Sequence, residues 1–275
     1  MWRTAAASAL GLVLCIAAVH SHDRWEAMST ECLNDDDASD LCNQLVHGQP
    51  QEHDVEAVSP ARDEDWMVVE TKARRSYEVK MFSASTILGI SSLNAASNGL
   101  LLNRVTSAGA TLTSSTAPDG TINFADAGTW LAVRWTGGTS SQRDFIRVQG
   151  KNYGNPTAND RYVIELLDTT YDVPRFNSSG TQTTVLLLRN ASPATLTGSI
   201  FFYSAAGALL HTEPLSLPVN GLQVVSTAAI GALAGQSGSA AIAHNGPYGA
   251  IAGKAVALEP STGFTFDTAV LPVPK

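Results

Sequence analysis

The stretch "SYEVKMF" (residues 76–82) decides the fold class. Its apolar and polar positions alternate strictly, with Tyr77, Val79 and Met81 on one side and Glu78 and Lys80 on the other. A period of two residues is typical of an antiparallel strand with one buried face. The stretch therefore predicts a strand whose apolar residues point inward and whose Glu78 and Lys80 point outward.

Segments of the same kind recur along the chain. "DWMVVET", "TWLAVRW", "RDFIRVQ" and "DRYVIELLD" lie in the middle; "TTVLLLRN", "LQVVST", "AAIAHN" and "GFTFDTAVL" lie in the tail, with a hairpin predicted to turn near Ala206 and Gly207. Turn sequences such as "APDGT" and "TGGT" separate them. Short strands at this spacing favour β-sandwiches over helical folds. In "DWMVVET", we expect Trp66 and Val68 to point inward and Asp65 to be exposed to water.

Charge and composition divide the chain into regions. The counts of Asp/Glu against Lys/Arg are thirteen to two over residues 22–65, but three to four over residues 173–275. Between the middle and the tail, "TTYDVPRFNSSGTQ" (Thr169–Gln182) is rich in Pro, Gly and Ser and resembles a linker. We predict an all-β protein with two tandem antiparallel β-sandwich domains of jelly-roll or Ig-like type, over residues 49–172 and 173–275.

The N-terminal region predicts export. Arg3 precedes an apolar run, Ala5–Val19, of the length that a signal peptide uses, and small residues suit cleavage after Ser21. We expect residues 1–21 to be a signal peptide, the alternative being a buried N-terminal helix, and the mature chain to be secreted or periplasmic, with no membrane span. The net charge of −8 argues against a nucleic-acid partner.

An acidic leader over residues 22–48 should follow the signal peptide. It contains Cys32 and Cys42, the two cysteines of the mature chain. Two nearby cysteines in an exported protein predict one disulfide.

The sequence gives little support for catalysis. Asp63 and Asp65 lie two apart and meet the spacing of a carboxylate pair, but no cleft signal accompanies them. "GQSGS" (Gly235–Ser239) differs from a nucleophile elbow in the position of its second glycine. His211 and His244 have no patterned partner and are expected to be surface or edge histidines.

Aromatic residues offer a second kind of site. Strand alternation places Trp130 and Trp135 on opposite faces of "TWLAVRW", so one belongs to the core and the other is a candidate for exposure. If Trp135 is exposed, Arg134 and Arg143 would lie beside it and form a ligand-binding face.

The middle of the chain resembles the bacterial pre-peptidase C-terminal (PPC) domain. The likeness covers about Asn34–Asp168. It rests on Asp63 to Trp66, on "SYEV", and on Gly128-Thr129-Trp130 leading to Val133. Arg74 departs from the pattern, because family members usually have Gly in that turn. The tail resembles small C-terminal β-sandwiches of exported bacterial proteins. The resemblance implies a non-catalytic appendage used for folding, secretion or substrate contact.

The resemblance also admits a calcium site, because related collagen-binding domains bind calcium between an acidic leader and the sandwich. The candidate ligands here are Asn34, Asp35, Asp36, Asp37, Asp63 and Asp65. Calcium takes about six to eight oxygen ligands, and these side chains could supply several of them. The alternative is a solvated acidic leader beside an aspartate pair that only bounds a strand.

Together these features predict an exported, non-catalytic binding or accessory protein that contacts an extracellular polymer, a protein or the cell envelope. Two alternatives stay open: a structural component of a surface or matrix, and a secreted hydrolase.

Overall fold

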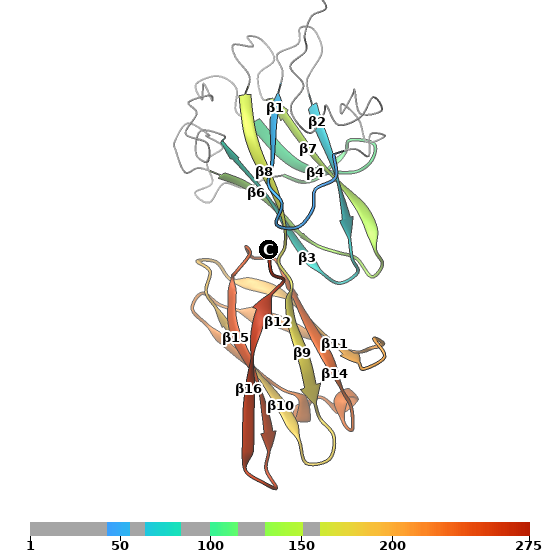
Figure 1. Cartoon of the computed structure of the whole chain (residues 1–275), viewed down its shortest axis with the longest axis vertical. Coiled ribbons are helices and arrows are strands. Elements are labelled where there is room, and N and C mark those ends of the chain that lie inside the picture. The colour runs from blue at the N-terminus through green and yellow to red at the C-terminus, as the bar shows by residue number, and fades with distance from the viewer. Residues whose placement is uncertain (1–42, 56–63, 84–99, 115–129, 151–159) are drawn as a thin grey trace, which may run out of the picture.

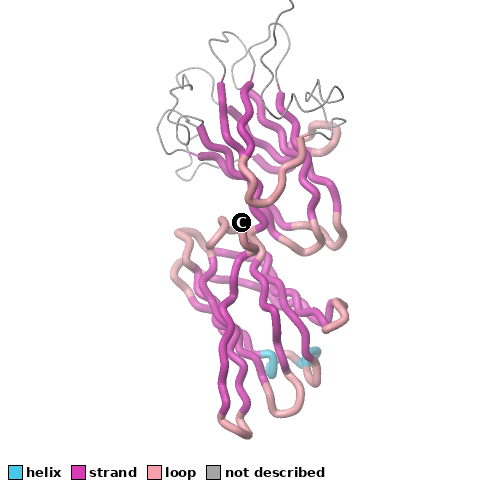
Figure 2. Tube along the Cα trace, in the orientation of Figure 1, coloured by secondary structure: helices cyan, strands magenta, loops and turns pink. Residues whose placement is uncertain are grey.

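A computed structural model describes residues 43–55, 64–83, 100–114, 130–150 and 160–275. In this part of the chain the fold is all-β, as predicted, and the only helical elements are two short 3-10 turns, Thr227–Ala229 and Gly231–Leu233. Two units lie end to end (Figure 1): an N-terminal unit over residues 43–168 and a C-terminal unit over residues 171–275. Figure 2 shows strands running along both units. No helix in the described ranges is long and apolar enough to cross a membrane.

The N-terminal unit contains two four-stranded antiparallel sheets with one core between them. One sheet has the order β1-β8-β3-β6, with β1 Gln51–Val55, β8 Asp160–Asp168, β3 Ser76–Ser83 and β6 Trp130–Thr136. The other has the order β2-β7-β4-β5, with β2 Glu64–Thr71, β7 Gln142–Gly150, β4 Leu100–Val105 and β5 Thr111–Ser114. Leu45, in the segment before β1, joins this core, and its N–H donates to the carbonyl of Val68.

The core confirms the alternation in β3 but reverses the one expected in β2. Tyr77, Val79 and Met81 are buried in the N-terminal core, as predicted. In β2, Met67 and Val69 enter that core, whereas Trp66 and Val68 lie on the opposite face. Trp66 is still buried, because the Arg147 guanidinium lies over its ring at 5.6 Å and the Phe145 ring packs against it edge-on. The expected direction was wrong since both faces of β2 are covered, so apolar alternation could not tell them apart.

The C-terminal unit is a single eight-stranded sheet in the order β12-β11-β14-β9-β16-β15-β10-β13. Its strands are β9 Tyr171–Asn177, β10 Thr183–Asn190, β11 Leu196–Ser204, β12 Leu209–Leu217, β13 Leu222–Ser226, β14 Ser237–His244, β15 Ile251–Glu259 and β16 Phe264–Pro272. The sheet curls so that its two ends meet, where the Gln223 side chain of β13 bonds the backbone of Ser216 and Pro214 in β12. The curled sheet encloses one core, which includes Phe176, Leu186 and Phe202.

Most tail strands agree with the sequence prediction. β10 coincides with "TTVLLLRN", and the β11–β12 hairpin turns at Gly207, whose φ of 82° suits glycine. β9 was not expected, because Pro174 and the Ser- and Gly-rich residues after it resemble a linker. The chain passes from one unit to the other at Thr169 and Thr170, directly between β8 and β9.

Candidate binding site

The predicted calcium ligands lie largely outside the described residues; this holds for Asn34, Asp35, Asp36, Asp37 and Asp63, and for Cys32 and Cys42 of the predicted disulfide. Asp65 is described, and the expectation that it is exposed was wrong. It is fully buried on the core side of β2, and Tyr162 donates a hydrogen bond to its Oδ2. No group of three or more His, Cys, Asp or Glu able to hold a metal occurs among the described residues. The calcium site therefore stays a prediction.

Trp135 does not meet the condition set for an aromatic ligand face, because only 6% of it is exposed. Its Nε1 donates to Asp144 Oδ2 at 2.9 Å, and the Arg104 guanidinium, which also binds Asp144, lies over its ring. Its ring packs against Tyr77 in the core. Trp135 therefore stabilises the N-terminal core.

Arg134 and Arg143, the other two residues of that predicted face, are separated from Trp135. Arg134 points to the other side of β6 and binds Glu78, and Arg143 pairs with the exposed Glu70. The side chain of Trp130 is not described. The structure therefore does not bring Trp135, Arg134 and Arg143 to one surface.

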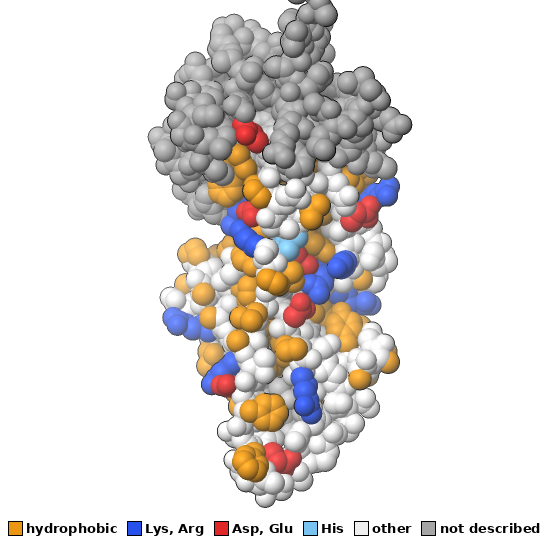
Figure 3. All heavy atoms as spheres, in the orientation of Figure 1, with side chains coloured by type: hydrophobic (Ala, Val, Ile, Leu, Met, Phe, Trp, Pro, Cys, Tyr) orange, Lys and Arg blue, Asp and Glu red, His pale blue; other side chains and the backbone are white. Residues whose placement is uncertain are grey.

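The outward-facing Glu78 is fully buried, because the C-terminal unit covers it. The backbone N–H of Tyr248, in the loop between β14 and β15, donates to Glu78 Oε2 at 2.9 Å. Arg134 binds the other carboxylate oxygen through Nε at 2.8 Å and Nη2 at 2.6 Å, and Lys80 lies 3.4 Å from Oε2. Charged side chains gather where the two units meet (Figure 3). We call this contact region, which also includes His47 and His244, the junction.

Both junction histidines use both ring nitrogens for backbone contacts. His47 Nδ1 accepts from the N–H of Asp168, so Nε2 carries the proton and donates to the carbonyl of Pro274. His244 Nδ1 accepts from the N–H of Gly246, and its Nε2 donates to the carbonyl of Thr169 at 2.9 Å. Burial lowers the pKa of His244 to about 4. His244 is therefore a neutral, buried structural residue, and the prediction of a surface or edge histidine was wrong at this position.

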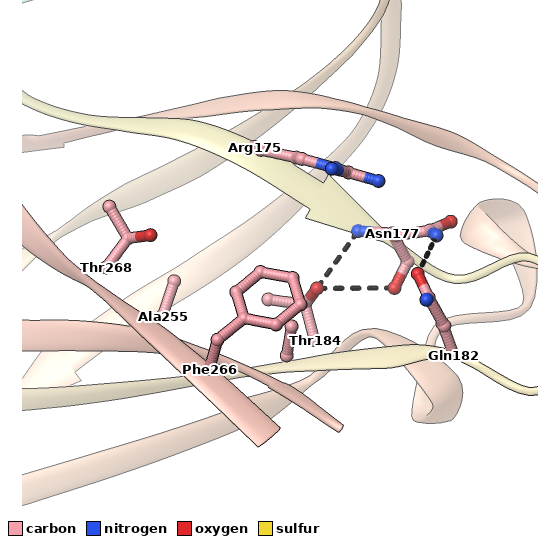
Figure 4. Close-up of a pocket in the computed structure, with 8 residues that line it drawn as sticks. Arg175, Asn177, Gln182, Thr184, Ala255, Phe266 and Thr268 are labelled. Atoms are coloured by element: carbon pink, nitrogen blue, oxygen red, sulfur yellow. Dashed lines mark hydrogen bonds between the residues drawn. The ribbon is translucent and has the colours of Figure 1, made fainter. Parts of the chain in front are cut away.

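A slot opens in the C-terminal unit where β9 and β16 separate. The two strands pair only through Asp172 with Leu271 and Tyr171 with Pro272, close to the junction, and then diverge toward the far end of the unit (Figure 1). Between them lies a cavity of about 50 Å³. Its lining comes from β9, β10, β15, β16 and the turn before β10: Arg175, Asn177, Gln182, Thr184, Ala255, Ala257, Phe266 and Thr268 (Figure 4).

A β-bulge places Arg175 at the slot. Val173 pairs with Ala240 of β14 and Phe176 pairs with Gly238, so Pro174 and Arg175 both lie opposite one residue of β14. Pro174 has no N–H to give to a neighbouring strand, and bulges often redirect a side chain. Both residues are exposed in succession, and the Arg175 side chain extends from β9 along the slot (Figure 4).

Hydrogen bonds close the far end of the slot but leave Arg175 available. The N–H of Asn177 donates to Thr184 Oγ1 at 2.9 Å, that hydroxyl contacts the carbonyl of Asn177 at 3.2 Å, and the Asn177 amide donates to Gln182. Arg175 has no ion pair with any residue that the structure describes. Across the slot, Phe266 is 54% exposed. The slot thus combines a cation and an aromatic ring with a floor of small side chains.

Sequence reasoning missed every residue of this slot. The one sequence signal that could have indicated strand β9 was the spacing of its apolar residues Tyr171, Val173 and Phe176, which are buried in the core. Comparison with known proteins adds no assignment: neither a family model, nor a curated protein, nor a solved structure matches the chain.

Proposed function

We propose that this chain is an exported, non-catalytic binding module of the PPC-like kind, which contacts an extracellular polymer or protein through the slot between β9 and β16. The observation that carries the proposal is the arginine in that slot. Arg175 is held at the surface by a bulge, lacks an ion pair within the described part of the chain, and faces an exposed Phe266. Arginine and aromatic side chains are the types most enriched where proteins bind their partners.

The described histidines and carboxylates support the non-catalytic reading. His244 is neutral and bonded at both nitrogens, and His211 contacts only the neighbouring Glu213 among charged groups that the structure describes. Glu78 and Asp144 are occupied by arginines inside the fold. Acid–base catalysis needs such groups at a substrate cleft with a pKa suited to proton transfer, whereas these groups stabilise the two units.

The experiment is a retention assay with the mature chain immobilised and offered peptidoglycan, acidic polysaccharides and extracellular matrix proteins. We expect at least one of these to be retained, with retention weakened several-fold by Arg175→Gln. The matched control is Arg189→Gln, which removes another exposed arginine of the same unit on the outer side of β10. Absence of retention on the whole panel would contradict the proposal.

A structural role at a surface or in a matrix is the second candidate, and one sheet face favours it. Leu222, Val224 and Leu271 are 57–62% exposed on the outer face of the sheet, where Val224 lies beside Leu187. Exposed apolar surface of this kind is typical of association sites. Sedimentation of the mature chain over a range of concentrations tests this role, since a matrix component that associates through this face should form concentration-dependent oligomers, and Val224→Lys should disperse them.

A further inference from the structure

We infer that the slot binds an extended peptide that adds to the open edge of β16 and places a carboxylate against Arg175. This inference rests on the proposed binding function and names the class of partner. Three observations support it: the unpaired edge of β16, the small side chains on the slot floor, and the position of Arg175.

The edge of β16 is open over most of its length. Residues 264–270 pair with β15 on one side, and on the other side β9 reaches only Leu271 and Pro272. An edge with free N–H and C=O groups is a template for another strand. Pro and charged residues usually protect such edges, but residues 264–270 contain no proline, and their one charge, Asp267, pairs with Lys254.

The edge of β9 that faces β16 is protected, so we expect an added strand to pair with β16 rather than with β9. Pro174 removes one donor from β9, and the hydroxyl of Thr184 occupies both backbone groups of Asn177. An incoming strand therefore finds the more open ladder on β16. The Arg175 side chain lies along β9 at the side of the slot, with its guanidinium toward the Asn177 end (Figure 4).

The floor leaves room for the side chains of the incoming strand. Ala255 and Ala257 on β15 and Thr268 on β16 are small, and the cavity above them measures about 50 Å³. Phe266 is half exposed on the same side of β16 as Thr268 and can cover an apolar residue of the peptide. These features suit an alternating sequence in which small or apolar residues face the slot.

Arg175 sets the charge preference of the slot. It is the only Lys or Arg among the residues that line the cavity, and no Asp or Glu is among them. A guanidinium binds a carboxylate through two parallel N–H···O bonds, which is stronger and more directional than a contact with a neutral amide. A glutamate or aspartate near the centre of the peptide therefore matches the slot best.

A displayed peptide library tests the inference with the full mature chain as target. The library holds alternating Thr, Val, Ser and Leu residues over a length that can pair with residues 264–270, with Glu fixed at the centre. We expect retained peptides to lose about tenfold in affinity when the central Glu becomes Gln. Arg175→Gln should cause a similar loss, and the two changes together should cost little more than either alone, because they remove the same contact. Arg189→Gln is the control and should leave binding unchanged.

Backbone methylation tests whether the peptide adds as a strand. Two peptides are compared, one N-methylated at its odd-numbered amides and the other at its even-numbered amides. One of them should lose binding and the other should bind nearly as before, because alternate amides of a strand face the partner. Equal binding by both methylated peptides would overturn strand addition.

Oligogalacturonate serves as the comparison for a carboxylated polysaccharide. If it binds with dependence on Arg175 while no peptide in the library does, the peptide inference is overturned and the proposed binding function stands. If neither class is retained and the wider polymer and protein panel also fails, the proposed function falls with it.

Discussion

The imidazole of His244 shows how a buried titratable side chain can be fixed by its two neighbours. Gly246 supplies a donor to Nδ1 and Thr169 an acceptor to Nε2, so only the neutral ring with its proton on Nε2 satisfies both contacts. The sequence predicted a surface or edge histidine here, and that prediction was wrong, because His244 is buried. The sequence could not indicate the contacts, because Thr169 is 75 residues away in the chain.

The free energy of unfolding should fall in acid because of His244. The pKa of His244 is lowered to about 4 in the folded chain, against 6.5 for an ordinary histidine. Between these values the unfolded chain binds the proton and the folded chain does not, so this contribution is complete above pH 6.5 and is lost as the pH falls toward 4. We expect a loss of about 2–3 kcal/mol in the free energy of unfolding between pH 7 and 4.5.

Urea unfolding of the wild type and of His244→Gln at several pH values measures this contribution. The variant keeps a donor for Thr169 but cannot titrate, so its stability should depend less on pH over this range. His211→Gln, at a half-buried histidine of β12, is the control and should follow the wild type. Parallel pH curves for wild type and His244→Gln would contradict the prediction.

Among the elements, those with clean alternation or continuous apolar runs were predicted best. β3, β8 and β10 follow such patterns and lie where the sequence placed them. β9 was missed because a proline-bearing bulge interrupts its alternation, and the slot was missed with it. The slot residues come from strands up to about ninety positions apart, and a local pattern carries no information on such pairing.

The turn between β2 and β3 gives a prediction at this scale. Arg74 has a φ of 58°, a left-handed conformation that costs an ordinary residue about 1 kcal/mol. This is the position where the PPC resemblance leads one to expect Gly. We expect Arg74→Gly to stabilise the chain by about 0.5 kcal/mol, since relief of strain exceeds the added freedom of the unfolded chain. Thermal unfolding measures it.

Asn220 is the matched control for this turn. It has a φ of 57°, but asparagine tolerates the left-handed region better than arginine does. Asn220→Gly should therefore gain less than Arg74→Gly. A lower melting temperature for Arg74→Gly would show that its side chain contributes more than its backbone costs.

The junction joins the two units into one molecule through a buried carboxylate. Alternation correctly placed Glu78 on the outward face of β3, yet it is unexposed because Tyr248 and Arg134 cover it. The sequence of one unit shows which residues face outward, but it does not show that a second unit will cover them. The all-β class was therefore predictable, and the junction was not.

Replacing Glu78 should weaken both the fold and the coupling of the units. Glu78→Gln removes the carboxylate charge that Arg134 binds in a largely buried place, which we expect to cost about 3 kcal/mol. Calorimetry should then show two transitions where the wild type shows one, because a neutral amide accepts more weakly than a carboxylate from the Tyr248 loop and from Arg134. Glu70→Gln, at an exposed pair with Arg143, should cost under about 1 kcal/mol. A single unshifted transition for Glu78→Gln would contradict this account.

The junction also has a mechanical consequence. Gly48 and Lys275 lie against each other there, with His47 bonded to Pro274 and Lys275 bonded to Glu165, while the slot is at the far end of the C-terminal unit. A pulling force applied between residues 48 and 275 would act on these contacts first. β16, which lines the slot, leads directly into Lys275, so tension between these two points would strain the junction first and reach the slot through β16 only after the junction contacts had broken.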